Sequence, residues 1–219
     1  MIKAILFDLD GTLINTNELI IESFNHTFKK LFNKDVPRNE IVKTFGEPLR
    51  DAMASYNEEK ADLMVSVFRE YNEANHDNKA TIFRGVREGL EGLKGLGIKL
   101  GVVTSKRGNL ARRGLNLIGI YDYMDVIVTP EDTKQHKPLA EPALKACELL
   151  NVLPQETIMV GDSHNDILCG KNAKCYTCLV NYTALSLKEL MRYNPDYTID
   201  SIEELVDICG NFDENKKAI

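Results

Sequence analysis

Two aspartates follow the first apolar run of the chain, in the sequence Asp8-Leu9-Asp10-Gly11-Thr12-Leu13. Residues 2–7 are apolar and few enough for a strand that is buried on both faces. Because side chains alternate along a strand, Asp8 and Asp10 leave its end on the same side. An acidic pair there is costly unless a cation or catalysis requires it. The pair is therefore a candidate functional site, although aspartates that only cap a turn would also fit.

Two later segments offer groups that could hold a phosphate. Thr104 and Ser105 follow the apolar run 98–103, and hydroxyls with nearby backbone N–H groups can bind phosphate oxygens. Lys137 precedes Pro138, which suits an early helical position, and a lysine at this point can neutralise phosphate charge. Taken singly, the hydroxyls could equally cap a helix near Asn109, and the lysine could be a solvated charge.

A fourth segment, Gly161-Asp162-Ser163-His164-Asn165-Asp166, follows the apolar run 157–160. Hard cations take carboxylate oxygens from several directions, which Asp162 and Asp8 could supply together. Ser163 or Asn165 could cap the next helix at the same time. The segment is therefore a candidate metal site.

Alternating apolar patterns predict the elements that must position these residues. After residue 85 we expect strands over 98–103, 126–129, 157–160, 176–180 and 197–199, with helices over 86–96, 109–118, 142–150, 166–173, 187–193 and 202–208. This alternation predicts an α/β fold, a Rossmann-like parallel sheet with helices on both faces. Such sheets bind ligands at the carboxyl ends of their strands.

Residues 14–81 differ, because their apolar residues recur at helical spacing and no strand is expected between residues 14 and 79. We expect helices near 19–32, 39–45, 49–55 and 58–75, with a turn at 77–79. The predicted division is an α/β core of residues 1–13 and 82–219, with a small all-helical domain of residues 14–81 inserted after the first strand. Alternatively, these helices belong to the main core. The charged tail at 213–217 is expected to fray.

Composition excludes several classes of function. The 219 residues carry a net charge of -6 and contain no basic run, which disfavours nucleic-acid binding. No apolar run approaches the roughly 18 residues of a membrane span, and the early first strand leaves no room for a signal peptide, so we expect a cytoplasmic protein. Five cysteines indicate reduced thiols, and strand alternation would place Cys175 and Cys178 on opposite faces, which disfavours zinc or redox chemistry there.

Taken together, the four segments resemble in order the four motifs of the haloacid dehalogenase-like superfamily, most of whose members are phosphatases. The helical insertion resembles the cap domain of that superfamily. The resemblance implies that Asp8 is the nucleophile, which forms an aspartyl-phosphate, and that Asp10 is the acid/base. It also implies that Thr104, Ser105 and Lys137 bind the transferring phosphoryl group.

The resemblance further implies an Mg²⁺ site. Its ligands would be the carboxylates of Asp8 and Asp162 and the backbone carbonyl of Asp10, while Asp166 would orient a metal-bound water or Lys137. We expect a raised pKa for Asp10, since a free aspartate titrates near ~3.9, and an Asp8 kept ionised by the cation.

Within the superfamily, Thr104-Ser105-Lys106 and the stretch 45–51 resemble the phosphoglycolate phosphatase and inorganic pyrophosphatase branches. Arg50 from the cap, with Lys106 or Arg107 from the core, could hold a second anionic group of a small substrate. Alternatively, Arg50 pairs with Glu47 or Asp51 on its own helix.

The resemblance implies an enzyme, a phosphoric monoester hydrolase or inorganic pyrophosphatase that acts on a small phosphorylated metabolite. The alternatives are a sugar-phosphate mutase of the β-phosphoglucomutase type and a non-catalytic phosphate-binding regulatory protein. We expect a small-molecule phosphate substrate, no nucleic-acid or membrane partner, and a monomer or homodimer.

Overall fold

A computed structural model describes residues 1–212 of the chain. The charged segment 213–217, for which fraying was predicted, lies outside the described residues. Within the described part of the chain, no helix combines the length and apolar character that a membrane crossing needs.

Six parallel strands form the main sheet in the order β5-β4-β1-β6-β7-β8. Their bounds are β1 (Ala4–Phe7), β4 (Lys99–Val103), β5 (Val126–Val128), β6 (Thr157–Gly161), β7 (Tyr176–Val180) and β8 (Tyr197–Ile199). The first strand lies between β4 and β6, with Phe7 in register with Val102 on one side and Val160 on the other. The carboxyl end of β1 therefore lies beside the ends of the two strands that carry the next motifs.

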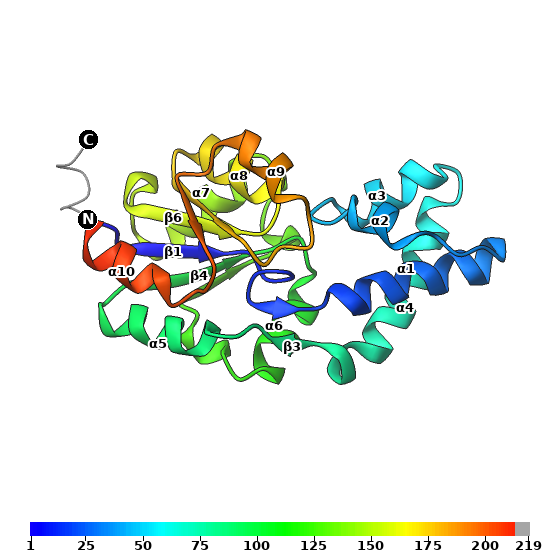
Figure 1. Cartoon of the computed structure of the whole chain (residues 1–219), viewed down its shortest axis with the longest axis horizontal. Helices are drawn as coiled ribbons and strands as arrows, with labels where there is room; N and C mark the ends of the chain where they lie inside the picture. Colours follow the sequence, from blue (N-terminus) through cyan, green and yellow to red (C-terminus); the bar gives the residue numbers. More distant parts are fainter. Residues whose placement is uncertain (213–219) are drawn as a thin grey trace.

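Helices cover both faces of this sheet (Figure 1). On one face, α5 (Val86–Gly95), α6 (Gly108–Leu117) and α10 (Glu204–Gly210) pack on Ile5 and Phe7. On the other face, α7 (Glu141–Leu150) and α8 (His164–Ala173) pack on Ala4 and Leu6. Strand alternation thus divides β1 between two apolar cores, which confirms the predicted α/β sheet with helices on both faces.

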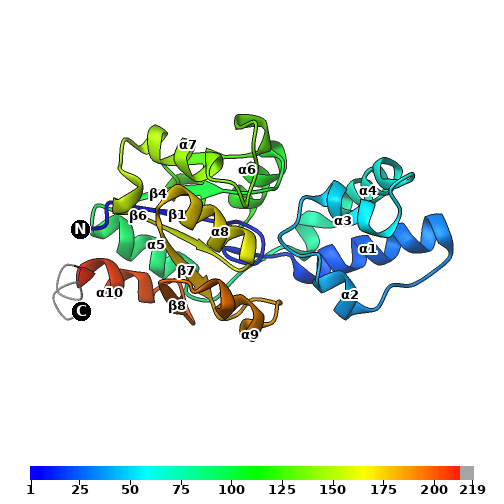
Figure 2. The same ribbon diagram turned by 90° about the horizontal axis from the view of Figure 1, so that it is seen from above.

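Four helices stand apart from the sheet, at one end of the molecule (Figure 2). They are α1 (Asn17–Phe32), α2 (Arg38–Val42), α3 (Leu49–Tyr56) and α4 (Ala61–Lys79). They share a separate apolar core, in which Phe24 of α1 makes an edge contact with Phe68 of α4 at 5.3 Å between ring centroids. The chain passes between the sheet and these helices at two short strands, β2 (Ile14–Asn15) and β3 (Thr81–Ile82), which pair antiparallel.

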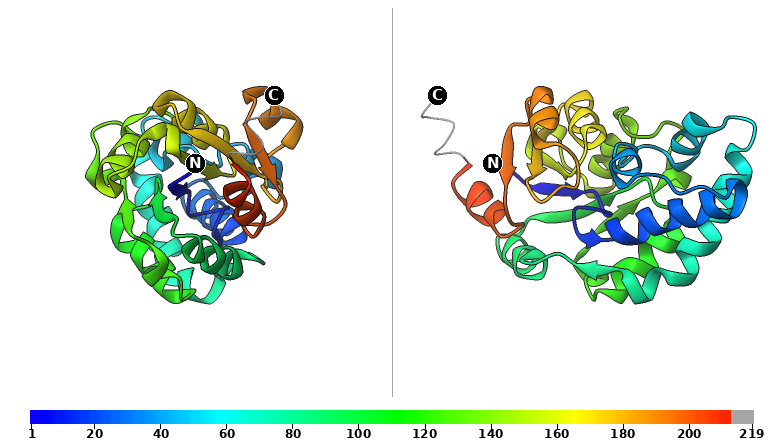
Figure 3. Two further views of the ribbon diagram at one scale, coloured as in Figure 1. Left: turned by 90° about the vertical axis from the view of Figure 1, so that its left-hand side faces the viewer. Right: turned by 45° about the vertical axis from the view of Figure 1, so that its right-hand side comes forward.

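The remaining elements are short connections. They are the four 3₁₀ turns η1 (Tyr121–Tyr123), η2 (Pro130–Asp132), η3 (Pro154–Glu156) and η4 (Met191–Tyr193), and the single helical turn α9 (Leu187–Leu190). The N-terminus and α10 lie at the end of the molecule away from α1–α4, as the right-hand view of Figure 3 shows. Cys175 and Cys178 belong to the cores on opposite faces of the sheet, as strand alternation predicted.

Three local predictions were wrong. Residues 77–79 continue α4 instead of forming a turn, because Lys79 pairs with Glu22 of α1 at 2.7 Å and ties the helix end to its neighbour. Ile14 and Asn15 form a strand, which is too short to give a periodic signal. Pro138 lies in a turn before α7, and Pro142 occupies the early helical position instead.

Candidate active site

Most of the predicted residues meet in one pocket at the carboxyl edge of the sheet. Asp8 and Asp10 follow β1, Thr104 follows β4, and Asp162 follows β6, so the order of the strands places them side by side. Lys137 reaches the same pocket from the loop between η2 and α7. Ser105, Lys106 and Arg107 also line it. Residues far apart in the sequence therefore share one site, as expected for a parallel sheet.

A buried lysine joins two of the carboxylates. Nζ of Lys137 lies 2.6 Å from Oδ1 of Asp8 and 2.7 Å from Oδ1 of Asp166, and all three side chains are buried. Burial opposes the charged form of Lys137, but the charges of Asp166 and Asp8 outweigh it, and the pKa of Lys137 lies above its ordinary value. This ammonium group is therefore a fixed positive charge beside Asp8.

Asp166 is held from two sides. Its Oδ2 accepts hydrogen bonds from the backbone N–H of Ser163 at 3.0 Å and from the Ser163 hydroxyl at 2.6 Å, which forms a capping box at the start of α8. Its Oδ1 accepts from Lys137. The helix cap that sequence analysis kept as an alternative at this segment is thus present, and Asp166 also orients Lys137.

Negative charge exceeds positive charge at this end of the sheet. Burial raises the pKa of Asp8 to about 7, with Lys137 opposing the shift and Asp166 adding to it. Burial and the charges of Asp166 and Asp8 hold the pKa of Asp162 well above its ordinary value. Asp8, Asp162 and Asp166 each offer a carboxylate oxygen, and these oxygens lie within 4.8 Å of one another. Three carboxylates around one lysine fit a divalent cation, because the cation would remove the remaining repulsion.

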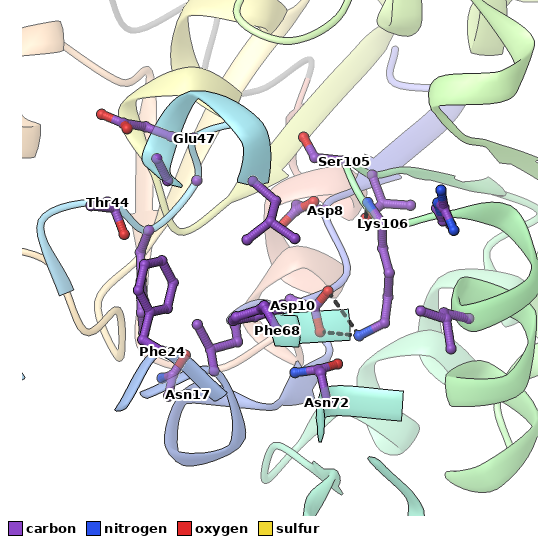
Figure 4. Close-up of a pocket in the computed structure, with 18 of the residues that line it drawn as sticks. Asp8, Asp10, Asn17, Phe24, Thr44, Glu47, Phe68, Asn72, Ser105 and Lys106 are labelled. Atoms are coloured by element: carbon purple, nitrogen blue, oxygen red, sulfur yellow. Dashed lines mark hydrogen bonds and ion pairs between the residues drawn. The ribbon is translucent and has the colours of Figure 1, made fainter. Parts of the chain in front are cut away.

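Asp10 takes no part in that cluster and points toward other partners. Its Oδ1 lies 2.8 Å from Nζ of Lys106 (Figure 4). The same oxygen accepts a hydrogen bond from the Thr16 hydroxyl at 2.7 Å. Burial alone would raise the pKa of Asp10, but the Lys106 charge and the hydrogen bonds from Lys106 and Thr16 hold it below its ordinary value. In this arrangement the pKa of Asp10 is therefore lowered, not raised as expected, because Lys106 pairs with Asp10.

The helical insertion closes the other side of the pocket. A cavity of about 190 Å³ lies between Asp8 and Asp10 and the four helices (Figure 4). The helical side is lined by Phe24 of α1, Phe68 and Asn72 of α4, and Thr44 and Glu47 of the α2–α3 connection. The site is therefore built jointly by the strand ends and the four helices.

One loop contact joins the helical insertion to the candidate metal-site segment, residues 161–166. Nδ2 of Asn165 donates to the carbonyl oxygen of Gly46 at 2.8 Å. Gly46 has φ +83, and a Cβ at this position would lie 2.7 Å from Cβ of Ser163. Glycine is thus required here both by its backbone conformation and by the close approach to Ser163.

The structure does not bring every predicted residue to the pocket. Arg50 is exposed, and it pairs with Glu58 and Asp62 at 3.1 Å each. These partners lie on and just before α4, so Arg50 takes neither the pocket position nor the pairing with Glu47 or Asp51 that the sequence suggested. Sequence analysis missed Thr16 and Arg69, the latter an arginine of α4 that lines the pocket.

Residues 5–180 match the family described as haloacid dehalogenase-like hydrolase. The chain is 50% identical over 208 residues to a Clostridium perfringens protein named "Putative pyrophosphatase PpaX", which covers 95% of this chain and 97% of that protein. It is 42% identical to "Pyrophosphatase PpaX" of Halalkalibacterium halodurans, over 95% of this chain and 97% of that protein.

A solved structure from Haemophilus somnus, described as a predicted phosphoglycolate phosphatase, resembles this one with a TM-score of 0.82 at 25% identity. The likeness covers 94% of this chain and 97% of that chain. The four segments that form the site described above are arranged as this family would have them. The family match along most of the sequence, the relatives and the shared fold all agree with that arrangement. The chain belongs to the haloacid dehalogenase-like hydrolase family and is an enzyme of that family.

Proposed function

We propose that the protein is a Mg²⁺-dependent phosphatase of small anionic phosphate compounds, pyrophosphate or a phosphoglycolate-like monoester, that works through an aspartyl-phosphate. The observation that carries the proposal is the contact of Asp8 with Lys137 at 2.6 Å, within a carboxylate cluster that faces a pocket. In this proposal Asp8 is the nucleophile, and Lys137 is the fixed positive charge beside it. Attack on a negatively charged phosphoryl group needs both.

In the first step, a carboxylate oxygen of Asp8 forms a bond to phosphorus while the bond from phosphorus to the leaving oxygen breaks. Asp10 gives its proton to that leaving oxygen, and Thr104, Ser105 and Lys137 bind the phosphoryl oxygens. In the second step, Asp10 takes a proton from water as the water oxygen attacks phosphorus, and the bond to Asp8 breaks. Inorganic phosphate leaves, and Asp8 is regenerated as a carboxylate.

The carboxylates of Asp8 and Asp162 and the backbone carbonyl of Asp10 would hold the Mg²⁺ ion, with Asp166 orienting Lys137 beside it. When bound, the ion supplies positive charge that keeps Asp8 ionised and offsets the charge of the phosphoryl oxygens. Asp10 must carry a proton for the first step, and it now pairs with Lys106. Release of Lys106 from Asp10 would let burial favour the protonated carboxyl.

The choice of substrate is supported by the relatives and by charge. The curated relatives are named pyrophosphatases, and the solved neighbour is described as a phosphoglycolate phosphatase. Five carboxylates line the pocket as well as four cations. Two of the cations pair with carboxylates and the other two form no ion pair within residues 1–212, which supports a small substrate with more than one negative group. The four cations are Arg69, Lys106, Arg107 and Lys137.

Phosphate release from pyrophosphate, phosphoglycolate and a panel of sugar phosphates, each with Mg²⁺, tests the proposal. We expect the first or the second compound to have the highest kcat/KM. Conversion of β-glucose 1-phosphate into its 6-phosphate would instead assign the protein as a mutase. An absence of phosphate release from the whole panel would overturn the proposed hydrolysis.

A further inference from the structure

The pocket contains two arginines that the catalytic scheme does not use. Of the four cations that line it, Lys106 pairs with Asp10, and Lys137 pairs with Asp8 and Asp166. Arg69 and Arg107 make no ion pair or side-chain hydrogen bond with any residue among 1–212. These two cations of the pocket are thus available to a ligand.

Arg69 lies on α4 directly after Phe68 and three residues before Asn72, both of which face the cavity (Figure 4). Its side chain is half-buried, and burial lowers its pKa. Other arginines of the helical insertion behave differently, since Arg38 pairs with Glu18 and Arg50 with Glu58. A half-buried guanidinium without a carboxylate partner is an unusual use of arginine, because its desolvation is not offset by pairing.

The charge of the second arginine, Arg107, further disfavours the charged form of Arg69. Arg107, an exposed residue of the α/β part that immediately precedes α6, lies close enough to Arg69 for its charge to lower the pKa of Arg69 further. Glu73 and Glu131 favour the charged form of Arg69, but neither lies within 4.0 Å of it among the described residues. Glu131 is occupied by the backbone N–H of Gly108 at 3.2 Å. An anion between the two guanidinium groups would offset their repulsion.

We propose that Arg69 of the helical insertion and Arg107 of the core together bind the second negative group of the substrate, the one that is not transferred to Asp8. This inference rests on the proposed hydrolysis of small anionic phosphate compounds. The group bound is a phosphate or a carboxylate, since a planar guanidinium binds either with two parallel hydrogen bonds. Arg69 takes the specificity role that the sequence suggested for Arg50. Because the two arginines come from different sides of the pocket, such a ligand also draws the helices toward the sheet.

The variant Arg69→Gln tests the proposal, with Arg50→Gln as the matched control. Both remove one arginine from the helical insertion, but Arg50 lies outside the pocket. Pyrophosphate and phosphoglycolate carry a second anionic group, whereas p-nitrophenyl phosphate carries none on its leaving group. For Arg69→Gln we expect KM to rise about 10-fold or more with the doubly anionic substrate that the enzyme uses, as loss of a charge-assisted contact implies. The KM for p-nitrophenyl phosphate should change less than 2-fold, and Arg50→Gln should leave both values near wild type.

Calorimetric binding of methylenediphosphonate with Mg²⁺, a non-hydrolysable compound with two anionic groups, gives a readout that is independent of turnover. Arg69→Gln should weaken this binding about 10-fold relative to Arg50→Gln. If Arg69→Gln raises KM more for pyrophosphate than for phosphoglycolate, the bound group is a phosphate. The reverse would identify it as a carboxylate.

An unchanged KM and unchanged binding in Arg69→Gln would overturn the proposal. An equal rise in KM for all three substrates would overturn it as well. If wild-type protein hydrolyses none of the substrates, the proposed hydrolysis fails, and the binding measurement still decides the role of Arg69. Melting temperatures of both variants close to that of wild type would show that the comparison concerns folded protein.

Discussion

Nζ of Lys106 lies 2.8 Å from Oδ1 and 3.1 Å from Oδ2 of Asp10, so the cation that follows β4 is bound to the carboxylate that follows β1. The pair is only partly exposed, with 10% of the Lys106 side chain and 23% of the Asp10 side chain accessible. Lys106 therefore keeps the proposed acid/base ionised in this arrangement. Departure of Lys106 becomes a requirement for proton transfer to the leaving oxygen.

Replacement of Lys106 by Gln is expected to raise the pKa of Asp10, because burial then acts without the opposing ammonium charge. The pH profile of kcat/KM with the preferred substrate should move toward higher pH by roughly one pH unit. Lys106→Arg keeps the positive charge and should retain the wild-type profile. An identical profile for Lys106→Gln would show that Lys106 does not set the ionisation of Asp10.

Asp8→Asn is expected to abolish turnover, since an amide oxygen is a poor nucleophile toward phosphorus. A loss of roughly 10⁴-fold or more in kcat is expected for removal of a covalent nucleophile. Phosphate release measures the loss, and the far-ultraviolet circular dichroism spectrum should remain that of wild type. Substantial remaining activity in folded Asp8→Asn protein would remove Asp8 from the nucleophile role.

Mg²⁺ is expected to stabilise the folded protein, because a divalent cation would offset the repulsion among Asp8, Asp162 and Asp166. Saturating MgCl₂ should raise the melting temperature by several degrees over NaCl of the same ionic strength, and chelation should abolish activity. Asp162→Asn should remove most of the thermal effect. An equal effect of NaCl would mean that the cluster binds no specific divalent cation.

Gly46→Ala is expected to reduce both stability and activity. A Cβ at Gly46 would strain its positive φ and press on Ser163, which directly follows Asp162. Gly97→Ala is the matched control, since Gly97 has φ +75 and nothing lies within 4 Å of its added Cβ. Both substitutions should cost about 1–2 kcal/mol of unfolding free energy, but only Gly46→Ala should also lower kcat/KM. Equal kcat/KM in the two variants would show that the close approach of Gly46 to Ser163 has no role in activity.

Asp125 is expected to contribute to stability in a pH-dependent way. Its Oδ2 accepts from the backbone N–H of Leu100 at 2.7 Å, and Lys94 lies 2.9 Å away. Partial burial raises the pKa of Asp125, but the Leu100 hydrogen bond and Lys94 outweigh it and lower the pKa. Because the folded pKa is depressed, this contribution is fully present above the unfolded pKa near ~3.9 and is lost as pH falls through the folded value.

The Asp125 side chain is 38% exposed and solvent screens its charge, so Asp125→Asn should lower the free energy of unfolding by less than ~1 kcal/mol at pH 7, with a difference that shrinks below pH ~4. Urea unfolding at several pH values measures it. Asp122→Asn, at a nearby exposed aspartate, should have little effect at any pH. A difference that persists unchanged at pH ~2 would contradict an ionised carboxylate as the source.

The α/β fold and the core of the site could be predicted from local signals. Buried strands are short apolar runs, and the residues at their carboxyl ends are next to them in the sequence, so Asp8, Thr104 and Asp162 could be found directly. Parallel strands then require these ends to lie at one edge of the sheet. The two-residue strand β2 and the end of α4 were missed, because packing between distant segments decides both.

Charge pairing depended on the tertiary structure. The spacing of Asp8 and Asp10 shows that both leave one strand end, but not that Lys137 binds the first and Lys106 the second. Arg50 lies in the first turn of α3 and Arg69 in the middle of α4, and the sequence does not show that Arg50 pairs with Glu58 while Arg69 lines the pocket. The sequence alone determined which backbone segments carry the reactive groups, because alternation and periodicity are local. Only the fold decided the partner of each charge, because pairing depends on distances between segments that are far apart in the chain.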